Sequence, residues 1–182
     1  MNAVRTRDDK APQAQSFEQT QYLTFMLDKE MFAIGILVIK EIIEFHTLTT
    51  VPMLPDSIRG VINLRGAVVP VIDLSARFGR SPAQIGKRTC IIIVEVESEG
   101  GRQDMGVIVD AVNQVLDIPA SEIEPPPAFG AKIRTDFIQG MGKVGGKFVI
   151  LLDVSRVLSI DEIGALAQVA KTAPPSAARS SA

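Results

Sequence analysis

The sequence predicts an all-β protein made of two similar modules, and three observations support this prediction. Valine and isoleucine account for 38 of the 182 residues, and these β-branched residues favour strands. Short apolar runs are separated by turn-forming residues at a spacing typical of small barrels or a sandwich. The chain also contains an internal repeat, which divides it into modules at about residues 20–85 and 88–160.

The repeat consists of two blocks that occur in the same order in both halves. Residues 58–78 lie over residues 138–158 without gaps, at an offset of 80. Residues 33–43 lie over residues 106–116, at an offset of 73. Identical residues of the first block include Gly60 and Gly140, Gly66 and Gly146, Val69 and Val149, Asp73 and Asp153, and Ser75 and Ser155. Two collinear matches indicate that each half carries the same structural unit.

Individual strands are predicted where apolar residues run between turn signals. Residues 63–66 and their copy 143–146 each separate two apolar runs, which predicts two hairpins, with Gly66 at a positive φ. Pro70 predicts that its strand is an edge strand or contains a bulge. The remaining strands are expected at residues 21–27, 31–36, 42–46, 89–97, 106–109 and 112–116.

Two helical turns and one longer helix are expected. Asp73 and Asp153 are each followed by a short Ser-containing segment and are typical N-caps. Apolar residues recur at helical spacing over residues 160–170, which predicts a short C-terminal helix. We interpret residues 1–17 as a disordered tail, and residues 166–182 as the end of the helix followed by a second disordered tail.

Composition excludes several classes of function. A formal net charge of −2 gives no electrostatic basis for nucleic-acid binding. With Cys90 as its one cysteine and His46 as its one histidine, the chain predicts no metal site, and we expect no cofactor. The chain shows no secretory signal, and its longest apolar run, residues 31–39, is too short to cross a bilayer. We therefore expect a cytoplasmic protein without direct membrane insertion.

The sequence also predicts that the protein is not an enzyme. Residues 140–145 spell G-x-G-x-x-G, but they lead into an apolar strand, whereas a dinucleotide fingerprint opens a helix. Asp73 and Asp153 are equivalent in the repeat, which favours capping over paired acid–base catalysis. His46 and Cys90 have no catalytic partner nearby in the sequence. An enzyme with its site between the modules remains the alternative from a different class.

Three segments of the first module resemble the CheW-like family of chemotaxis coupling proteins. These segments are residues 32–43, residues 51–55 and residues 58–74, the last with the motif G-V-x-N-L-R-G-x-x-x-P-x-x-D-L. The resemblance extends over residues 18–165. It implies two five-stranded SH3-like β-barrel subdomains that share a core, followed by a short C-terminal helix.

The resemblance also implies a function. Members of the family are non-catalytic adaptors that couple chemoreceptors to the histidine kinase CheA. They bind the cytoplasmic tip of the receptor and the regulatory domain of CheA, and they are recruited to membrane-associated receptor arrays. We predict the same role for this chain. The alternative within the same fold is a coupling module of a related receptor–kinase system that controls surface motility or gene expression.

The receptor-binding residues follow from the same resemblance. Arg65 matches the receptor-contact arginine of the family, and Ile39 and Glu41 match positions in its receptor-binding groove. The repeat gives separate support for Arg65, because the second copy has Gly145 at this position and the fold therefore does not require an arginine. We extend the predicted site to four neighbouring residues: Ile34, Ile36, Asn63 and Leu64.

Overall fold

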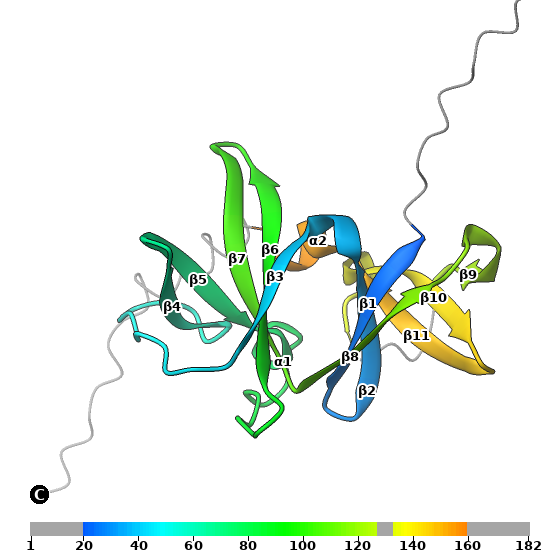
Figure 1. Ribbon diagram of the computed structural model, residues 1–182, viewed down its shortest axis with the longest axis horizontal. Coiled ribbons are helices and arrows are strands. Elements are labelled where there is room, and N and C mark those ends of the chain that lie inside the picture. The colour runs from blue at the N-terminus through cyan, green and yellow to red at the C-terminus, as the bar shows by residue number, and fades with distance from the viewer. Residues whose placement is uncertain (1–19, 127–132, 160–182) are drawn as a thin grey trace, which may run out of the picture.

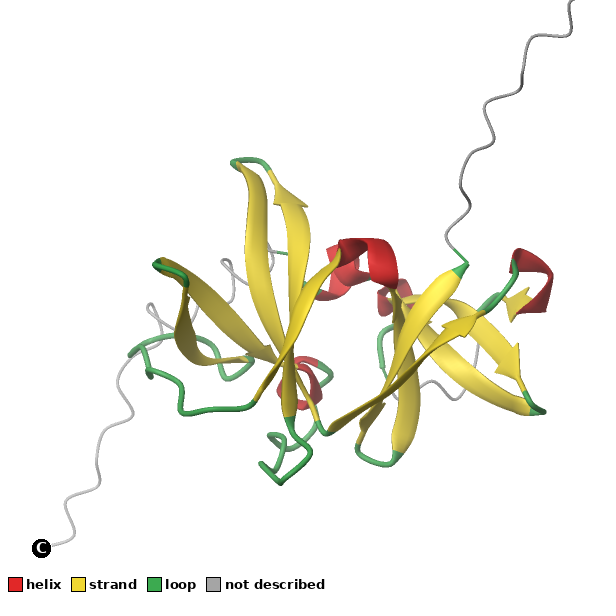
Figure 2. Ribbon diagram, viewed as in Figure 1, coloured by secondary structure: helices red, strands yellow, loops and turns green. Residues whose placement is uncertain are grey.

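The computed structural model describes residues 20–126 and 133–159, which form strands joined by short helical turns (Figure 1, Figure 2). The strands are β1 (Gln21–Leu27), β2 (Glu30–Gly35), β3 (Ile39–Glu44), β4 (Ile58–Leu64), β5 (Ala67–Asp73), β6 (Cys90–Ser98), β7 (Gly101–Val109), β8 (Ala111–Asp117), β9 (Ile123–Glu124), β10 (Ile138–Val144) and β11 (Lys147–Leu152). The helical segments are η1 (Ile36–Val38), α1 (Leu74–Arg77), η2 (Ala120–Glu122), η3 (Thr135–Phe137) and α2 (Val154–Val157). The predicted all-β fold class is confirmed.

The strands form two mixed sheets that lie side by side (Figure 1). The first has the order β3-β6-β7-β5-β4, and we call it the central barrel because its strands come from the middle of the chain. The second has the order β8-β1-β2-β11-β10-β9, and we call it the terminal barrel. The central barrel has the five strands expected, and the terminal barrel has five plus the two-residue β9.

The predicted division into modules at residues 20–85 and 88–160 is wrong, because each barrel draws strands from both halves. The hairpin β1–β2 joins β8 and β11, and the hairpin β6–β7 joins β3 and β5. In each barrel one parallel strand pair attaches the hairpin to strands from the other half of the chain. This pair is β2 with β11 in the terminal barrel and β7 with β5 in the central barrel. The repeat therefore describes a real structural unit, but two copies of the unit exchange their first hairpins to build the two barrels.

Short connections account for the exchange. A strand needs a turn of at least two residues to fold back on the strand before it. Only Asp110 separates β7 from β8, which is too short for such a turn, and the three residues between β2 and β3 are wound into the 3-10 turn η1, which does not lead the chain back along β2. Neither connection reverses the chain in one plane, so β8 and β3 continue into the neighbouring barrel. The strand that β3 or β8 pairs with therefore depends on where the chain runs after the connection, and the residues around each strand do not reveal this partner.

The repeat is nevertheless preserved in the strand register. Ile42 on β3 pairs with Ile92 on β6, and the equivalent Val115 on β8 pairs with Leu23 on β1. Both strand pairs also have a register shift at equivalent positions, next to Ile42 in one pair and next to Val115 in the other. Each strand of the central barrel thus has a counterpart in the terminal barrel: β3 and β8, β6 and β1, β7 and β2, β5 and β11, and β4 and β10.

The two predicted hairpins close with the same turn. Arg65 and Gly66 have φ angles of 51° and 85°, and Gly145 and Gly146 have 56° and 78°. Two consecutive residues of positive φ between paired strands define a type I′ turn, so the prediction for Gly66 is confirmed. The edge-strand prediction for Pro70 is wrong, because β5 pairs with strands on both sides. Its parallel pairing with β7 begins one residue after Pro70, so the missing N–H is not needed there.

Among the described residues the largest hydrophobic cluster spans both barrels, as expected for a shared core, and each barrel also has a smaller cluster of its own. Four phenylalanine rings form a chain through it, with centroid separations of 6.1, 5.7 and 6.0 Å from Phe25 to Phe32 to Phe78 to Phe137. Phe25 and Phe32 belong to the terminal barrel, and Phe78 follows α1 of the central barrel. Aromatic contacts of this kind add to the stabilisation from buried area, so the barrels are held together as one unit.

The chain ends and helix caps complete the fold. Asp73 and Asp153 accept hydrogen bonds from the first turns of α1 and α2, which confirms both predicted caps. The predicted helix at residues 160–170 and both predicted tails lie outside the described residues. Within the described ranges, no helix is long and apolar enough to cross a membrane.

Candidate partner-binding site

Two of the predicted site residues, Arg65 and Glu41, form an ion pair on the surface of the central barrel. The guanidinium makes two parallel hydrogen bonds to the carboxylate, Nη1 to Oε1 at 2.8 Å and Nη2 to Oε2 at 2.9 Å. These hydrogen bonds raise the pKa of Arg65 above its ordinary value. The Arg65 side chain remains 76 % exposed, so it stays available to a partner.

The turn between β4 and β5 positions this arginine. Arg65 lies in the left-handed region, which residues other than glycine and asparagine rarely adopt. Asn63 stabilises the turn, because its Oδ1 accepts a hydrogen bond from the N–H of Gly66 at 2.9 Å. The side chain of Asn63 therefore holds the turn, and it contributes to the site by presenting Arg65.

The same positions in the terminal barrel have lost both charges. The register of β3 and β8 makes Gln114 the equivalent of Glu41, and Gly145 is the equivalent of Arg65. Because the terminal barrel folds with the same turn without the ion pair, folding does not require it. The central barrel instead keeps a residue that its backbone disfavours, which is typical of a functional position.

An apolar groove lies between the two barrels, at η1, which directly precedes the strand β3 that carries Glu41. It encloses about 370 Å³, and its walls come from η1, the hairpin β6–β7 and α2. Its lining, which defines the apolar groove from here on, consists of Leu37, Val38, Glu95, Val96, Glu97, Arg102, Val154 and Ser155. Leu37 is 75 % exposed, an unusual position for a leucine that no partner covers.

Charged residues follow one rim of the groove. Lys40 donates a hydrogen bond to Asp104 at 2.9 Å and lies 3.4 Å from Glu95. These contacts, the hydrogen bond to Asp104 above all, raise the pKa of Lys40. Arg102 pairs with Glu95 at 3.2 Å across β6 and β7. The groove thus combines an apolar floor with a paired, polar rim, which is the usual composition of a protein–protein interface.

The other predicted residues divide between the site and the core. Ile36 and Ile39 are half-buried beside the apolar groove, where they pack against the shared core. Leu64 is half-buried next to Arg65 and supports the hairpin from inside the central barrel. Ile34 is only 4 % exposed and lies in the core. We therefore assign Ile34 to the core, and its predicted place in the site is wrong.

Sequence reasoning missed the residues that converge on the groove from distant segments. Val96 belongs to the central barrel and Val154 follows the last strand of the terminal barrel, and each resembles an ordinary core valine in the sequence. Lys40, Glu95 and Asp104 resemble solvated strand residues until the fold brings them together. Leu37 gave no signal either, because it lies inside the apolar run of residues 31–39 and resembles a core residue in the sequence.

The candidate catalytic residues do not assemble into a reactive site. His46 is exposed, and its Nδ1 lies 3.3 Å from the carbonyl oxygen of Glu44. Burial, and to a lesser extent the charge of Glu44, raises the pKa of the Cys90 thiol, which disfavours a reactive thiolate. Within residues 20–126 and 133–159, no three His, Cys, Asp or Glu side chains form a group that could hold a metal ion.

The fold and the site together define a binding module with an exposed ion pair on one barrel and an apolar groove between the two. Comparison with known proteins identifies its family: residues 21–162 match the model of the CheW-like domain. The chain is 34 % identical over 152 residues to the chemotaxis protein CheW of Klebsiella aerogenes, covering 84 % of this chain and 89 % of that protein. The chain belongs to the CheW-like domain family, a family of non-catalytic chemotaxis scaffolds.

Two further relatives extend the comparison. The crystal structure of the scaffolding protein TtCheW from Thermoanaerobacter tengcongensis superposes with a TM-score of 0.69 at 34 % sequence identity, covering 84 % of this chain and 93 % of that chain. Protein FrzA of Myxococcus xanthus is 28 % identical over 152 residues, covering 82 % of this chain and 92 % of that protein. The family assignment therefore rests on both sequence and fold.

Proposed function

We propose that this protein couples chemoreceptors to the histidine kinase CheA as a non-catalytic adaptor, recruited from the cytoplasm to membrane-associated receptor arrays. The observation that carries the proposal is the ion pair of Arg65 and Glu41, which the central barrel keeps and the terminal barrel lacks. The receptor binds beside this pair, and the kinase binds elsewhere on the two barrels.

The receptor contact combines apolar and charged parts. An amphipathic helix from the receptor's cytoplasmic tip lays its apolar side chains into the apolar groove, against Leu37, Val38 and Val154. Arg65 offers charge-assisted hydrogen bonds to carboxylate or carbonyl oxygens of the same helix. Glu41 holds the guanidinium in place before binding, so less side-chain entropy is lost when the complex forms.

The kinase contact uses exposed apolar residues that the repeat places on both barrels. Val68 is 70 % exposed, and its equivalent Phe148 is 51 % exposed. Ile42 and its equivalent Val115 are 42 % and 50 % exposed. A regulatory domain of similar barrel fold can pack against such faces, and an array multiplies individually weak contacts. The receptor and kinase sites are then separate, as an adaptor requires.

The replacement of Arg65 by asparagine tests the receptor site. Arg65→Asn removes the charge but creates Asn-Gly, the favoured pair in a type I′ turn, so the melting temperature stays the same or rises. We expect a purified receptor cytoplasmic fragment to lose binding to Arg65→Asn and to Glu41→Gln in a pull-down, while CheA is still retained. Arg88→Asn, which removes another exposed arginine, serves as the matched control.

Two results would contradict the proposal. Undiminished receptor binding by the folded Arg65→Asn variant would remove Arg65 from the site. Loss of both receptor and CheA binding by a folded variant would mean that the receptor and CheA do not bind at separate sites. The kinase contact is tested in the same assay, because Val68→Ser combined with Phe148→Ser should release CheA and retain the receptor.

The similarity to Protein FrzA favours a second candidate function. This relative matches over most of its length yet does not carry the name CheW. The same contacts would then serve a related receptor–kinase system that controls surface motility or gene expression. Deletion of the gene separates the two candidates: loss of swimming chemotaxis supports the first, and a defect confined to surface spreading or gene expression supports the second.

A further inference from the structure

The hairpin β6–β7 is longer than its counterpart in the terminal barrel, the hairpin β1–β2. Leu27 and Glu30 form the last pair of β1–β2 before its turn, and their equivalents Val96 and Gln103 are also paired. Beyond that pair, β6–β7 continues through six residues, 97–102, where β1–β2 has two. We call residues 97–102 the arm. Its tip projects beyond the rest of the central barrel (Figure 1).

The fold does not require the arm. In the terminal barrel the hairpin closes directly at Asp28 and Lys29, whose φ angles of 49° and 66° define a type I′ turn. The arm adds two cross-strand pairs before the chain turns, and Glu97 and Arg102 form the first of them. Because only one copy of the repeat has these residues, their presence needs an explanation other than folding.

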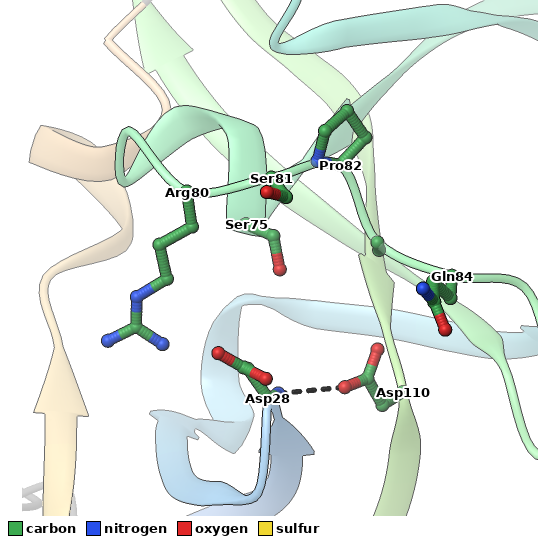
Figure 3. A pocket seen from close by; sticks show the side chains of 8 residues that line it. Asp28, Ser75, Arg80, Ser81, Pro82, Gln84 and Asp110 are labelled. Carbon is green, nitrogen blue, oxygen red and sulfur yellow. Dashed lines mark hydrogen bonds between the residues drawn. The ribbon is translucent and has the colours of Figure 1, made fainter.

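The arm forms one wall of the apolar groove. Glu97 and Arg102 lie in the lining of the groove together with Leu37 and Val154. A counterpart of the groove lies beside α1 and encloses about 590 Å³, and there the turn of β1–β2 supplies Asp28 in place of the arm (Figure 3). Three positions of the two linings are equivalent: Asp28 and Glu97, Ser75 and Ser155, and Asp110 and Leu37. The groove therefore differs from its counterpart by an added wall as well as by its apolar floor.

Ion pairs join the arm to the neighbouring strands. Arg102 Nη1 lies 3.2 Å from Glu95 Oε1, and Arg102 Nε lies 3.9 Å from Glu97 Oε1. Lys40 on β3 lies 3.4 Å from the same Glu95 and 2.9 Å from Asp104. The terminal barrel has uncharged residues at the equivalents of Lys40, Glu95 and Asp104, which are Asn113, Met26 and Met31. Because exposed ion pairs add little stability, this cluster orients the arm beside the groove more than it stabilises the barrel.

We infer that the arm selects which receptor helix enters the apolar groove, and this inference rests on the function proposed above. The side chains of Glu97 and Arg102 are 84 % and 70 % exposed, and they present opposite charges at the edge of an apolar floor. A helix that complements this edge carries a basic and an acidic side chain beside its apolar stripe, so that each meets its opposite charge on the arm. A helix with the same stripe but with like charges at this edge is rejected.

The test replaces residues 97–102 of the full chain by Asn-Gly, the favoured pair for the type I′ turn that closes β1–β2. Each strand loses two residues, so β6 and β7 keep their register and their faces. We expect a purified receptor cytoplasmic fragment to bind this shortened protein about tenfold more weakly than the parent protein, while CheA binding is unchanged. Its receptor affinity should also fall less between about 0.05 and 0.5 M NaCl, because charged contacts have been removed.

Single substitutions make the same test without shortening the hairpin. Glu97→Gln and Arg102→Gln should each weaken receptor binding about threefold, since each removes one charged contact at the edge of the groove. The matched control is Glu99→Gln, which removes an exposed charge from the tip of the same hairpin, outside the lining of the groove. This control should bind the receptor fragment as tightly as the parent protein does.

Three results would overturn the inference alone. Undiminished receptor binding by the shortened protein would remove the arm from the site, and loss of CheA binding with the receptor retained would assign the arm to the kinase contact. Equal weakening by Glu99→Gln and Arg102→Gln would indicate only diffuse attraction to the charges of the hairpin. A parent protein that does not bind the receptor fragment would overturn the proposed function as well, and this result appears before any residue is changed. Thermal unfolding confirms that each variant is folded, so a loss of binding cannot come from unfolding.

Discussion

The hairpins β4–β5 and β10–β11 are two copies of one structure, and their differences separate folding from function. From Gly60 to Pro70 and from Gly140 to Ile150, burial follows the same residue-by-residue pattern. Both copies keep the glycine at the second position of the turn, the aspartate cap and the exposed apolar residue after the turn. The residues that both copies share are those that the fold requires. A residue found in one copy alone is not required by the fold, so its presence needs another explanation.

The residues found in one copy alone lie at its surface and its cavities. Arg65 and Glu41 have neutral counterparts in Gly145 and Gln114. Asp110 has an apolar counterpart in Leu37. A duplicated structure thus offers two binding faces whose chemistry can differ while the core remains the same. The variants below change one copy and use the other as the control.

The largest difference is expected at the two helix caps. Asp73 is fully buried and accepts hydrogen bonds from Arg59 and from two backbone N–H groups, whereas Asp153 mainly caps α2. Asp73→Ala should lower the free energy of unfolding by about 3 kcal/mol, because it leaves a partly buried arginine unpaired. Asp153→Ala should lower it by about 1 kcal/mol. Urea unfolding of both variants checks this, and equal losses would contradict the distinction.

A smaller difference is expected at the paired glycines. A Cβ atom at Gly60 would lie 2.6 Å from the backbone oxygen of Thr49, which cannot move independently. At Gly140 a Cβ atom would lie 2.6 Å from a methyl group of Ile123, a side chain that can move in part, and 3.0 Å from the backbone oxygen of Glu124. Alanine should therefore cost about 2 kcal/mol at Gly60 and about 1 kcal/mol at Gly140. Thermal unfolding of the two alanine variants shows which one is less stable. A larger loss of stability at Gly140 than at Gly60 would contradict the prediction.

A still smaller effect should appear at the acidic residues before the hairpins. The hydrogen bond from Arg134 lowers the pKa of Asp136 below its ordinary value of 3.8. A lowered pKa in the folded state adds stability above the unfolded value, and this stability is lost as the pH falls through the folded value. Asp136→Asn should therefore be slightly less stable than the parent protein at pH 7, with the difference disappearing below about pH 3.

The control for this pH dependence is Asp56, the equivalent residue of the first hairpin, which has Leu54 in the position of Arg134. Asp56→Asn should change stability less than Asp136→Asn at pH 7. Stability is measured by denaturant unfolding at several pH values. A difference between the Asp136 variant and the parent protein that grows as the pH falls would contradict the expected sign.

The smallest effect on receptor binding is expected when the ion pair is moved to the other copy. Gln114→Glu with Gly145→Arg should build a similar pair on the terminal barrel; the exposed pair adds little stability, and arginine at the positive φ of Gly145 should lower the free energy of unfolding by about 1 kcal/mol. Combined with Arg65→Asn and Glu41→Gln, this change should not restore receptor binding, since the terminal barrel has Asp110 where the apolar groove has Leu37. Restored binding in the pull-down would show that either barrel presents a competent site.

Much of the fold was predictable because it depends on neighbouring residues. The Val- and Ile-rich runs, the hairpin turns at residues 63–66 and 143–146, and the caps at Asp73 and Asp153 all follow from contacts within a few residues. Comparison of the two halves also revealed Arg65, because a repeat provides its own reference for what the fold needs. The prediction for Ile34 failed because it was extended from neighbouring residues, and nearness in the sequence does not tell which side chains face the core.

The sequence by itself determined the fold class, the repeat and the turn that presents Arg65, since local conformational preferences decide each of them. Only the tertiary structure decided which barrel each hairpin joins. Connections as short as Asp110 force the chain across to the other sheet, and this long-range pairing has no local signature. The same crossing creates the apolar groove, because the groove joins η1, the hairpin β6–β7 and α2, which lie far apart in the chain.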